Sequence, residues 1–276
     1  MEHSSAAWVK SRFPVVHRCQ YMLSDNGGAT WSQPTDLDPS TQTALGNGPA
    51  IQLSDGSVLW ITYGPFEDTK HSSVGVYRST DRPRSFELYS MLQADFPMTE
   101  TSIAELPGGR LVMVVRREGN VSWSDDGGKT WAQSGDTGWD LFDPHLIVAP
   151  NGVLALFHGS YKTGALRVLL SPDGGQTWHG PAEWLGYSVD PSVYGYCHPI
   201  VLPDGTIYLV YLHTDGHLPA DARTQALWGL RVRIHDDAGG IDILPAPGAP
   251  AALGQLTSGL EQLPGEGGDP ELGNLP

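Results

Sequence analysis

An eight-residue pattern that recurs along the chain is the strongest constraint on its fold. The pattern is Ser-x-Asp-x-Gly-x-x-Trp, and its clear copies are SDNGGATW at 24–31, SDDGGKTW at 124–131 and SPDGGQTW at 171–178. A degenerate copy, STDRPRSF, spans 79–86. The leading serines stand at positions 24, 79, 124 and 171, so the copies lie 55, 45 and 47 residues apart. A repeated unit of about 50 residues is typical of the blades of a β-propeller.

A second pattern alternates with the octet. Four segments consist of an apolar run, an Asp-Gly, Gly-Gly or Asn-Gly pair, and another apolar run: IQLSDGSVLWITY from 51, IAELPGGRLVMVVR from 103, LIVAPNGVLALFH from 146 and IVLPDGTIYLVY from 200. Such pairs accept the positive φ angles of tight hairpin turns, so each segment predicts a β-hairpin. The runs are almost continuously apolar, which favours strands covered on both faces. The chain is therefore predicted to be all-β, with units of two inner strands followed by outer strands that the octet closes.

The octet itself is interpreted as a structural turn. Its aspartate is short enough to accept N–H bonds within its own turn, and its glycine supplies an unusual backbone angle. Its tryptophan can pack back over the sheet. A catalytic site is needed once, whereas this pattern occurs in several units, so the chemistry is expected elsewhere.

Composition narrows the range of partners. The net charge of −15 argues against nucleic acid, which requires a basic face. It also means that an anionic substrate would depend on local arginines. No apolar run reaches the length of a membrane span, and the first ten residues lack the apolar core of a signal peptide. Because the N-terminus looks incomplete, the compartment stays undecided between secreted and cytoplasmic.

Four polar residues occupy equivalent places in the repeat. Nine residues before the turn glycines at 56, 109, 152 and 205 stand Asn47, Glu100, Asp143 and Tyr196. If the units are equivalent, these residues begin successive inner strands and ring a central axis at one end. His145, His158, His198 and His213 lie near strand ends and could line the same cleft, although no pair has convincing metal-ligand spacing. Trp139 and Tyr161 could form a platform for a sugar or belong to the core.

The octet resembles the Asp-box, or BNR repeat, of the sialidase (neuraminidase) superfamily. The resemblance covers roughly residues 8 to 237. It implies a six-bladed β-propeller with its active site on the central axis and its Asp-boxes on the outer rim. The superfamily also contains Asp-box proteins without enzymatic activity, so the fold alone does not fix the function.

Two further segments resemble sialidase motifs. TETSIAELPGGRLVMVVR is similar to the family segment in which a glutamate is followed sixteen residues later by an arginine, here Glu100 and Arg116. YGYCHPIVLPDG is similar to the segment of the catalytic tyrosine, here Tyr196, and GALRVLLSPDGG places Arg167 where many members carry an arginine. The resemblance implies Tyr196 and Glu100 as catalytic residues and Arg116 and Arg167 as substrate-binding residues. Asn47 and Asp143 are expected ligand contacts by repeat equivalence.

The chemistry of sialic acid accounts for these residue types. This sugar carries a carboxylate on its anomeric carbon, which would repel a carboxylate nucleophile. A neutral tyrosine avoids that repulsion, and sialidases are the tyrosine exception among glycosidases. A neighbouring glutamate can take the phenolic proton, while arginines bind the substrate carboxylate in bidentate fashion. The expected activity is retaining cleavage of terminal sialic acid, or a related acidic sugar, from glycoconjugates, with no metal and no cofactor.

The chain also departs from the family pattern. The expected N-terminal Arg-Ile-Pro segment and the acidic loop of the first blade are not found, because Arg12 in RFP lies too close to the first octet for an inner hairpin to fit. An N-terminal half-blade is therefore expected to be missing, through truncation or a misplaced start codon. The alternatives are a catalytically inactive carbohydrate- or protein-binding propeller, or a glycosidase or lyase of other specificity. The propeller is predicted to span 1–238, and the Gly/Pro-rich segment 239–276 to be a flexible tail, part of which could close the last blade.

Overall fold

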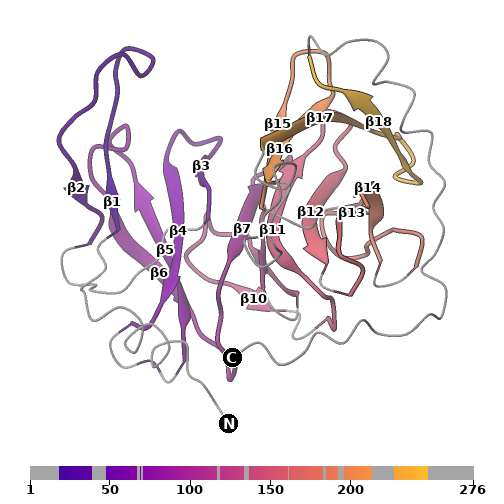
Figure 1. Cartoon of the computed structure of the whole chain (residues 1–276). Helices are drawn as coiled ribbons and strands as arrows, with labels where there is room; N and C mark the ends of the chain where they lie inside the picture. The colour runs from indigo at the N-terminus through magenta and orange to yellow at the C-terminus, as the bar shows by residue number, and fades with distance from the viewer. Residues whose placement is uncertain are drawn as a thin grey trace, which may run out of the picture.

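The protein is an all-β propeller. The computed structural model describes residues 19–38, 48–66, 69, 71–116, 119–133, 137–160, 162–182, 185–191, 196–212 and 227–247. Within these ranges four antiparallel four-stranded sheets follow one another along the chain, preceded by one two-stranded sheet. Figure 1 shows the sheets arranged in chain order, from the indigo strands on the left to the orange and yellow strands on the right.

The strands of each blade are consecutive in sequence. Blade 1 consists of β3 (Ala50–Gln52), β4 (Val58–Gly64), β5 (Ser73–Ser79) and β6 (Glu87–Leu92). Blade 2 consists of β7 (Thr101–Glu105), β8 (Leu111–Val115), β9 (Asn120–Ser124) and β10 (Ala132–Gln133). Blade 3 consists of β11 (Phe142–Val148), β12 (Leu154–Ser160), β13 (Ala165–Ser171) and β14 (Tyr187–Asp190). Blade 4 consists of β15 (Cys197–Val201), β16 (Ile207–Leu212), β17 (Leu227–Ile234) and β18 (Ile241–Pro245).

The prediction of a β-propeller is confirmed, but the blade count differs from the six expected. The described residues form four complete blades and the two-stranded sheet of β1 (Gln20–Tyr21) and β2 (Thr35–Asp36). This small sheet flanks the first octet and packs on blade 1, where Tyr21, Trp60 and Phe86 form a T-shaped aromatic cluster with centroid distances of 5.2 to 6.3 Å. It takes the place expected for the outer half of a preceding blade.

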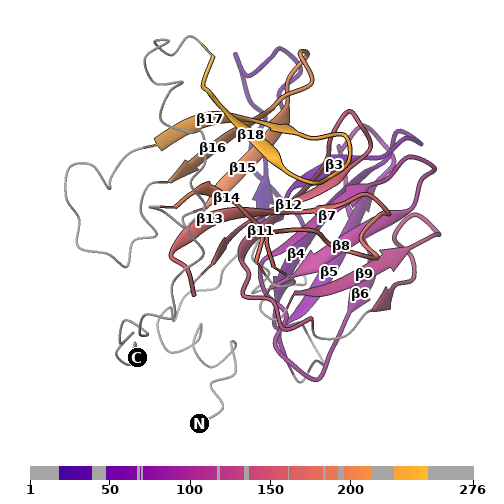
Figure 2. The ribbon, with the colours of Figure 1, turned by 90° about the vertical axis from the view of Figure 1, so that its right-hand side faces the viewer.

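The sheet of blade 4 continues past residue 238, where the propeller was predicted to end, so part of the 239–276 segment closes the last blade, as the sequence analysis allowed. Strand β18 pairs with β17 from Leu230↔Pro245 to Ile234↔Ile241 and forms the outer strand of blade 4. Figure 2 shows β18 beside β17 in that sheet. Apolar side chains at Ile241 and Ile243 pack on the core, which is why this part of the Gly/Pro-rich segment joins the blade. The rest of the predicted tail, from 248 onward, lies outside the described residues.

Three hydrophobic cores fill the spaces between successive blades. In β8, Leu111, Met113 and Val115 face blade 1, while Val112 and Val114 face blade 3. Successive side chains of a strand point to opposite faces, so a strand between two blades must be apolar at every position. This explains the continuous apolar runs in the sequence. A third core joins blades 3 and 4 around Phe157 and Leu209.

The hairpin turns fold as their sequences predict. The glycines at 56, 109, 152 and 205 have φ angles of 81° to 90°, which an L side chain rarely adopts. Strands β7, β11 and β15 are the first strands of blades 2, 3 and 4, and each contacts the next, β7 with β11 and β11 with β15. The start of each of these strands therefore lies close to the start of the next.

The octets form closed hydrogen-bonded turns, as expected for a structural motif. In the second clear copy, Asp126 Oδ1 accepts the backbone N–H groups of Lys129 and Thr130 at 2.9 Å each, and Ser124 Oγ accepts that of Gly128. Asp173 repeats this arrangement, and Trp131 and Trp178 pack against the interblade cores. Ser171 pairs with Leu154, whereas Phe142 pairs with Gly159, so in blade 3 the octet lies at the end opposite the start of β11.

The degenerate octet gives a prediction for acid stability. Hydrogen bonds from Ser79, Ser85 and Arg84 lower the pKa of Asp81 from 3.8 to about 2. A carboxyl whose folded pKa is depressed stabilises the fold above its unfolded pKa, and this contribution is lost as the pH falls toward the folded pKa. Asp81→Asn should therefore differ most from the wild type at neutral pH, with the difference shrinking between about pH 4 and about pH 2. Urea unfolding midpoints across this range test the expectation, and a difference that does not change with pH would contradict it.

Candidate active site

Glu100 and Arg116 flank the hairpin of β7 and β8 and meet at its open end. The backbone N–H of Arg116 donates to the carbonyl of Glu100 at 2.9 Å, which extends the strand pairing by one step. Their side chains form an ion pair between Arg116 Nη1 and Glu100 Oε1. Glu100 is buried, with 6% of its surface exposed. A spacing of sixteen residues across a tight hairpin therefore brings these two charges together.

Asp143 connects this pair to the next blade. It is the second residue of β11, where the register shifts at a β-bulge, and it has a left-handed φ of 43°. Aspartate is among the few non-glycine residues that accept such angles. Its backbone N–H donates to Glu100 Oε2 at 2.9 Å, and its carboxylate Oδ2 accepts the N–H of Cys197 at 3.3 Å. Blades 2, 3 and 4 are thus joined through one buried residue.

Tyr196 immediately precedes β15 and is 38% exposed. Its ring packs against Phe142 with a centroid distance of 4.9 Å, and the guanidinium carbon of Arg116 lies 4.8 Å from the centroid of the same Phe142 ring. Phe142 therefore positions both the tyrosine and the arginine. Sequence reasoning missed this residue, although it stands directly before the predicted Asp143.

Burial and charge perturb the ionisation of these groups. Burial raises the pKa of Glu100. The positive charge of Arg116 lowers this pKa, whereas the carboxylate of Asp143 raises it further. Burial also raises the pKa of Tyr196, and the negative charges of Glu100 and Asp143 raise it further. The Tyr196 phenol is consequently neutral at physiological pH, and a base is needed before it can act as a nucleophile.

A second tyrosine belongs to the same cluster. Burial, followed by the charge of Glu100, raises the pKa of Tyr63 to about 12. Tyr63 also interacts electrostatically with Tyr196. Tyr63 lies seven residues after Gly56, just as Arg116 lies seven residues after Gly109, so the alignment of the repeats contained a signal for it.

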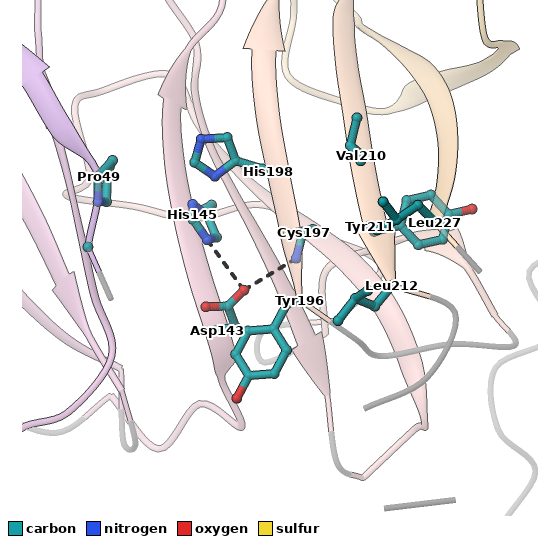
Figure 3. A pocket seen from close by; sticks show the side chains of 11 residues that line it. Pro49, Asp143, His145, Tyr196, Cys197, His198, Val210, Tyr211, Leu212 and Leu227 are labelled. Carbon is teal, nitrogen blue, oxygen red and sulfur yellow. Dashed lines mark hydrogen bonds and ion pairs between the residues drawn. The ribbon is translucent and has the colours of Figure 1, made fainter. Parts of the chain in front are cut away.

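A pocket of about 340 Å³ opens beside this cluster. Asp143, His145, Tyr196 and His198 lie on one side of it, and Pro49 lies across from them. Figure 3 shows His145 and His198 on the same side of the pocket as Asp143, with Nε2 of His145 3.3 Å from Asp143 Oδ2. The two imidazole rings pack edge to face at 5.0 Å. Glu100 and Arg116 are not among the lining residues and contact the wall through Asp143 and Phe142.

The other predicted site residues are distributed as follows. Arg167 lies in β13, where Nε donates to Thr163 Oγ1 at 2.9 Å and Nη1 to the carbonyl of Gly186 at 2.8 Å; it does not line the pocket. His158 is buried beside it, and desolvation lowers its pKa to about 4. Trp139 packs on Trp178 at 5.5 Å as part of a core rather than as a sugar platform. Asn47, Tyr161 and His213, together with Arg12, lie outside the described residues.

Metal sites and membrane spans each require a particular set of residues within the described ranges. No group of three His, Cys, Asp or Glu side chains there is arranged to hold a metal ion. The same part of the chain contains no helix with the length and hydropathy needed to cross a bilayer.

Comparison with known proteins agrees with the architecture. The BNR repeat-like domain family matches residues 4–140, about half of the chain. No curated protein matches the chain in sequence. A crystal structure from Dyadobacter fermentans, described as a protein of unknown function, superimposes with a TM-score of 0.56 and 19% identity, covering 90% of this chain and 71% of that one.

Sialidases are among the similar structures. The Hadza microbial sialidase Hz136 has a TM-score of 0.55 and 22% identity over 72% of this chain and 44% of its own. The NanB sialidase of Streptococcus pneumoniae, as its K499G mutant, has a TM-score of 0.55 and 19% identity over 70% of this chain and 32% of its own. This chain thus spans less than half of the length of either sialidase. The repeated Asp-boxes, the blade topology and the match to the BNR repeat-like family identify the chain as a β-propeller of BNR (Asp-box) repeats, with the fold that these sialidase structures share.

Proposed function

We propose that the protein is a retaining glycoside hydrolase of the sialidase type, acting on terminal sialic acid or a related acidic sugar. The observation that carries the proposal is the position of Tyr196, a partly exposed phenol at the pocket whose pKa is raised more by the buried carboxylate of Glu100 than by any other neighbouring charge. A tyrosine beside a base is the arrangement that a tyrosine-based glycosidase requires. The roles given to individual residues below belong to this proposal.

Glu100 acts as the base. Its raised pKa brings it nearer to the neutral range in which general bases are most effective, while the ion pair with Arg116 keeps it charged. Tyr196 Oη attacks the anomeric carbon while its proton passes to Glu100. The bond from that carbon to the aglycone oxygen breaks, the aglycone leaves as an oxyanion, and a covalent tyrosyl glycoside remains. Water then attacks the same carbon, the bond to Tyr196 Oη breaks, and Glu100 returns its proton to the departing tyrosine. The proton that the water loses passes through solvent to the aglycone oxyanion, and two displacements at one carbon retain the configuration overall. Among the described residues we assign no general acid to the leaving group.

Recognition of the substrate carboxylate falls to arginines. Arg116 lies on the Phe142 ring next to Tyr196, and a guanidinium there can form charge-assisted hydrogen bonds to a carboxylate on the reacting carbon. A tyrosine nucleophile is consistent with such a substrate because it meets the carboxylate without a like charge. Arg167 contributes to this clamp only if its side chain leaves the carbonyl of Gly186 and Thr163.

That engagement of Arg167 favours a second candidate function. With one of the two clamp arginines bonded inside its own blade, the pocket would suit an uncharged sugar, either hydrolysed or only bound. An α-L-arabinanase of Penicillium chrysogenum, solved in complex with arabinobiose, shares the fold with a TM-score of 0.50 and 17% identity over 74% of this chain and 64% of its own.

Hydrolysis of fluorogenic aryl glycosides separates these functions. An aryl sialoside has a leaving group that departs without protonation, so the assay does not depend on a general acid. The proposal predicts release of the fluorophore from the sialoside and none from the matched arabinofuranoside. Activity only on the neutral sugar would overturn the sialidase assignment, and saturable binding of sialyllactose without turnover would favour the binding propeller.

A further inference from the structure

The bulge at the start of β11 connects all parts of the cluster. Phe142 supplies the ring between Arg116 and Tyr196, and Asp143 supplies hydrogen bonds toward both neighbouring blades. Glu100 and Tyr196 lie 96 positions apart in sequence, on blades 2 and 4, and blade 3 lies between these two blades. Their relative position therefore depends on the residues of β11 that contact both.

Asp143 makes one hydrogen bond toward blade 2 and one toward blade 4. Its N–H holds Glu100 Oε2 at 2.9 Å, while its Oδ2 holds the N–H of Cys197, the residue that directly follows Tyr196. The same Oδ2 lies 3.3 Å from His145 Nε2. The Asp143 side chain is 4% exposed, so these contacts are made away from bulk water, where hydrogen bonds to a charged group are strongest.

The backbone of Asp143 is held in an uncommon conformation. Its φ of 43° coincides with the register shift between Phe142 and His145. Residues in such conformations persist when surrounding contacts enforce them, and they cluster at functional sites. The left-handed turn is what directs the N–H toward Glu100 while the side chain reaches Cys197.

We infer that Asp143 is a positioning residue that fixes Tyr196 and Glu100 relative to each other, rather than a ligand contact as the repeat alone suggests. The inference deepens the proposed function and rests on it for its kinetic consequences. Its geometric content does not depend on the function, because the hydrogen bonds join Glu100 to Cys197, the residue directly after Tyr196, whatever the protein binds.

Two substitutions separate the side-chain role from the backbone role. Asp143→Gly fits the left-handed φ but removes both side-chain contacts, whereas Asp143→Asn keeps the shape and an acceptor oxygen for Cys197 while removing the charge. Asp143→Gly should lower kcat on the aryl sialoside about a hundredfold with little change in KM, since small misplacement of reacting groups has effects of that size. Asp143→Asn should restore most of this loss.

The charge of Asp143 provides a readout that a purely structural role would not change. Glu100 is faced by Arg116 after β8, Asp143 in β11, Tyr63 in β4 and Tyr196 before β15. Among these, Asp143 raises the pKa of Glu100. Asp143→Asn should therefore move the acidic limb of the pH–kcat profile to lower pH.

The same titration can be followed without catalysis. In NMR spectra of protein labelled with ¹³Cζ-tyrosine, the Tyr196 resonance is the one that is missing in Tyr196→Phe. The pH-dependent shift of this resonance that disappears in Glu100→Gln reports the titration of Glu100. The inference predicts a lower midpoint in Asp143→Asn. Asp173→Asn, in the octet at the far end of the same blade, should leave both the midpoint and kcat unchanged.

The outcomes distinguish the inference from the proposed function. If the wild type hydrolyses no sialoside but the midpoint moves in Asp143→Asn, the proposed function fails and the positioning role stands. If the wild type is active and Asp143→Gly retains its kcat with an unmoved midpoint in Asp143→Asn, the inference is wrong. Circular dichroism and melting curves identify a variant that fails to fold, in which case Asp143→Asn decides the matter.

Discussion

Replacing Tyr196 with phenylalanine is expected to abolish hydrolysis of an aryl sialoside, lowering kcat by at least about 10⁴-fold. The phenolic oxygen is the atom that the mechanism places on the anomeric carbon, and phenylalanine offers no nucleophile there. The ring remains, so its packing against Phe142 at 4.9 Å should be retained. Folding and the melting temperature should change little because Tyr196 is 38% exposed.

Two other tyrosines give this experiment its controls. Tyr89 lies on the outer strand β6, under Arg78 at 4.9 Å, and Tyr89→Phe keeps that ring and should retain full activity. Tyr63 is the rival phenol beside Glu100, with its pKa raised to about 12. If Tyr63→Phe loses activity to the same degree while Tyr196→Phe keeps it, the assignment of the nucleophile is wrong.

Replacing Glu100 with glutamine should have the second largest effect. Loss of a general base typically lowers kcat about 10²- to 10⁴-fold. The amide still accepts the N–H of Asp143, but Arg116 loses its buried counter-charge, so the free energy of unfolding should also fall by about 3 kcal/mol. Kinetics at a temperature well below the melting point of the variant separate the two effects.

Glu105 is a matched control at the other end of the same strand. It ends β7, where its carboxylate accepts the backbone N–H and the hydroxyl of Ser54 at 2.7 Å each. Glu105→Gln changes the same functional group in the same blade without touching the pocket, so kcat should stay at the wild-type value. Equal losses in both variants would show that Glu100 supports the fold and not the chemistry.

Much of the architecture could be predicted from local sequence rules. The turn glycines after each apolar run fix the hairpins, and the alternation Leu111–Val115 explains how one strand faces two cores. Alignment of the repeats on those glycines predicted that Glu100, Asp143 and Tyr196 stand at the starts of successive inner strands. In the structure, hydrogen bonds join Asp143 to Glu100 and to the residue after Tyr196.

Other features depend on contacts that a repeat does not encode. The bulge at Asp143 adds a residue to one strand only, so repeat equivalence did not predict the hydrogen bonds by which Asp143 links the blades. Arg167 occupies a strand position where an arginine was expected. Its guanidinium, however, donates a hydrogen bond to the carbonyl of Gly186 in the same blade. The outer strand β18 lies beyond the boundary predicted at residue 238. The Gly and Pro residues around this short apolar strand make it hard to recognise from the sequence.

Trapping the covalent intermediate tests the central claim most directly. The aryl sialoside loses its leaving group readily, so hydrolysis of the tyrosyl intermediate should limit turnover and the intermediate should accumulate. Acid quenching during turnover, followed by proteolysis and mass spectrometry, should then show a sialyl group on the peptide carrying Tyr196, and none in Tyr196→Phe. A sialoside that is hydrolysed with the sugar on another residue, or that is not hydrolysed at all, would contradict the account.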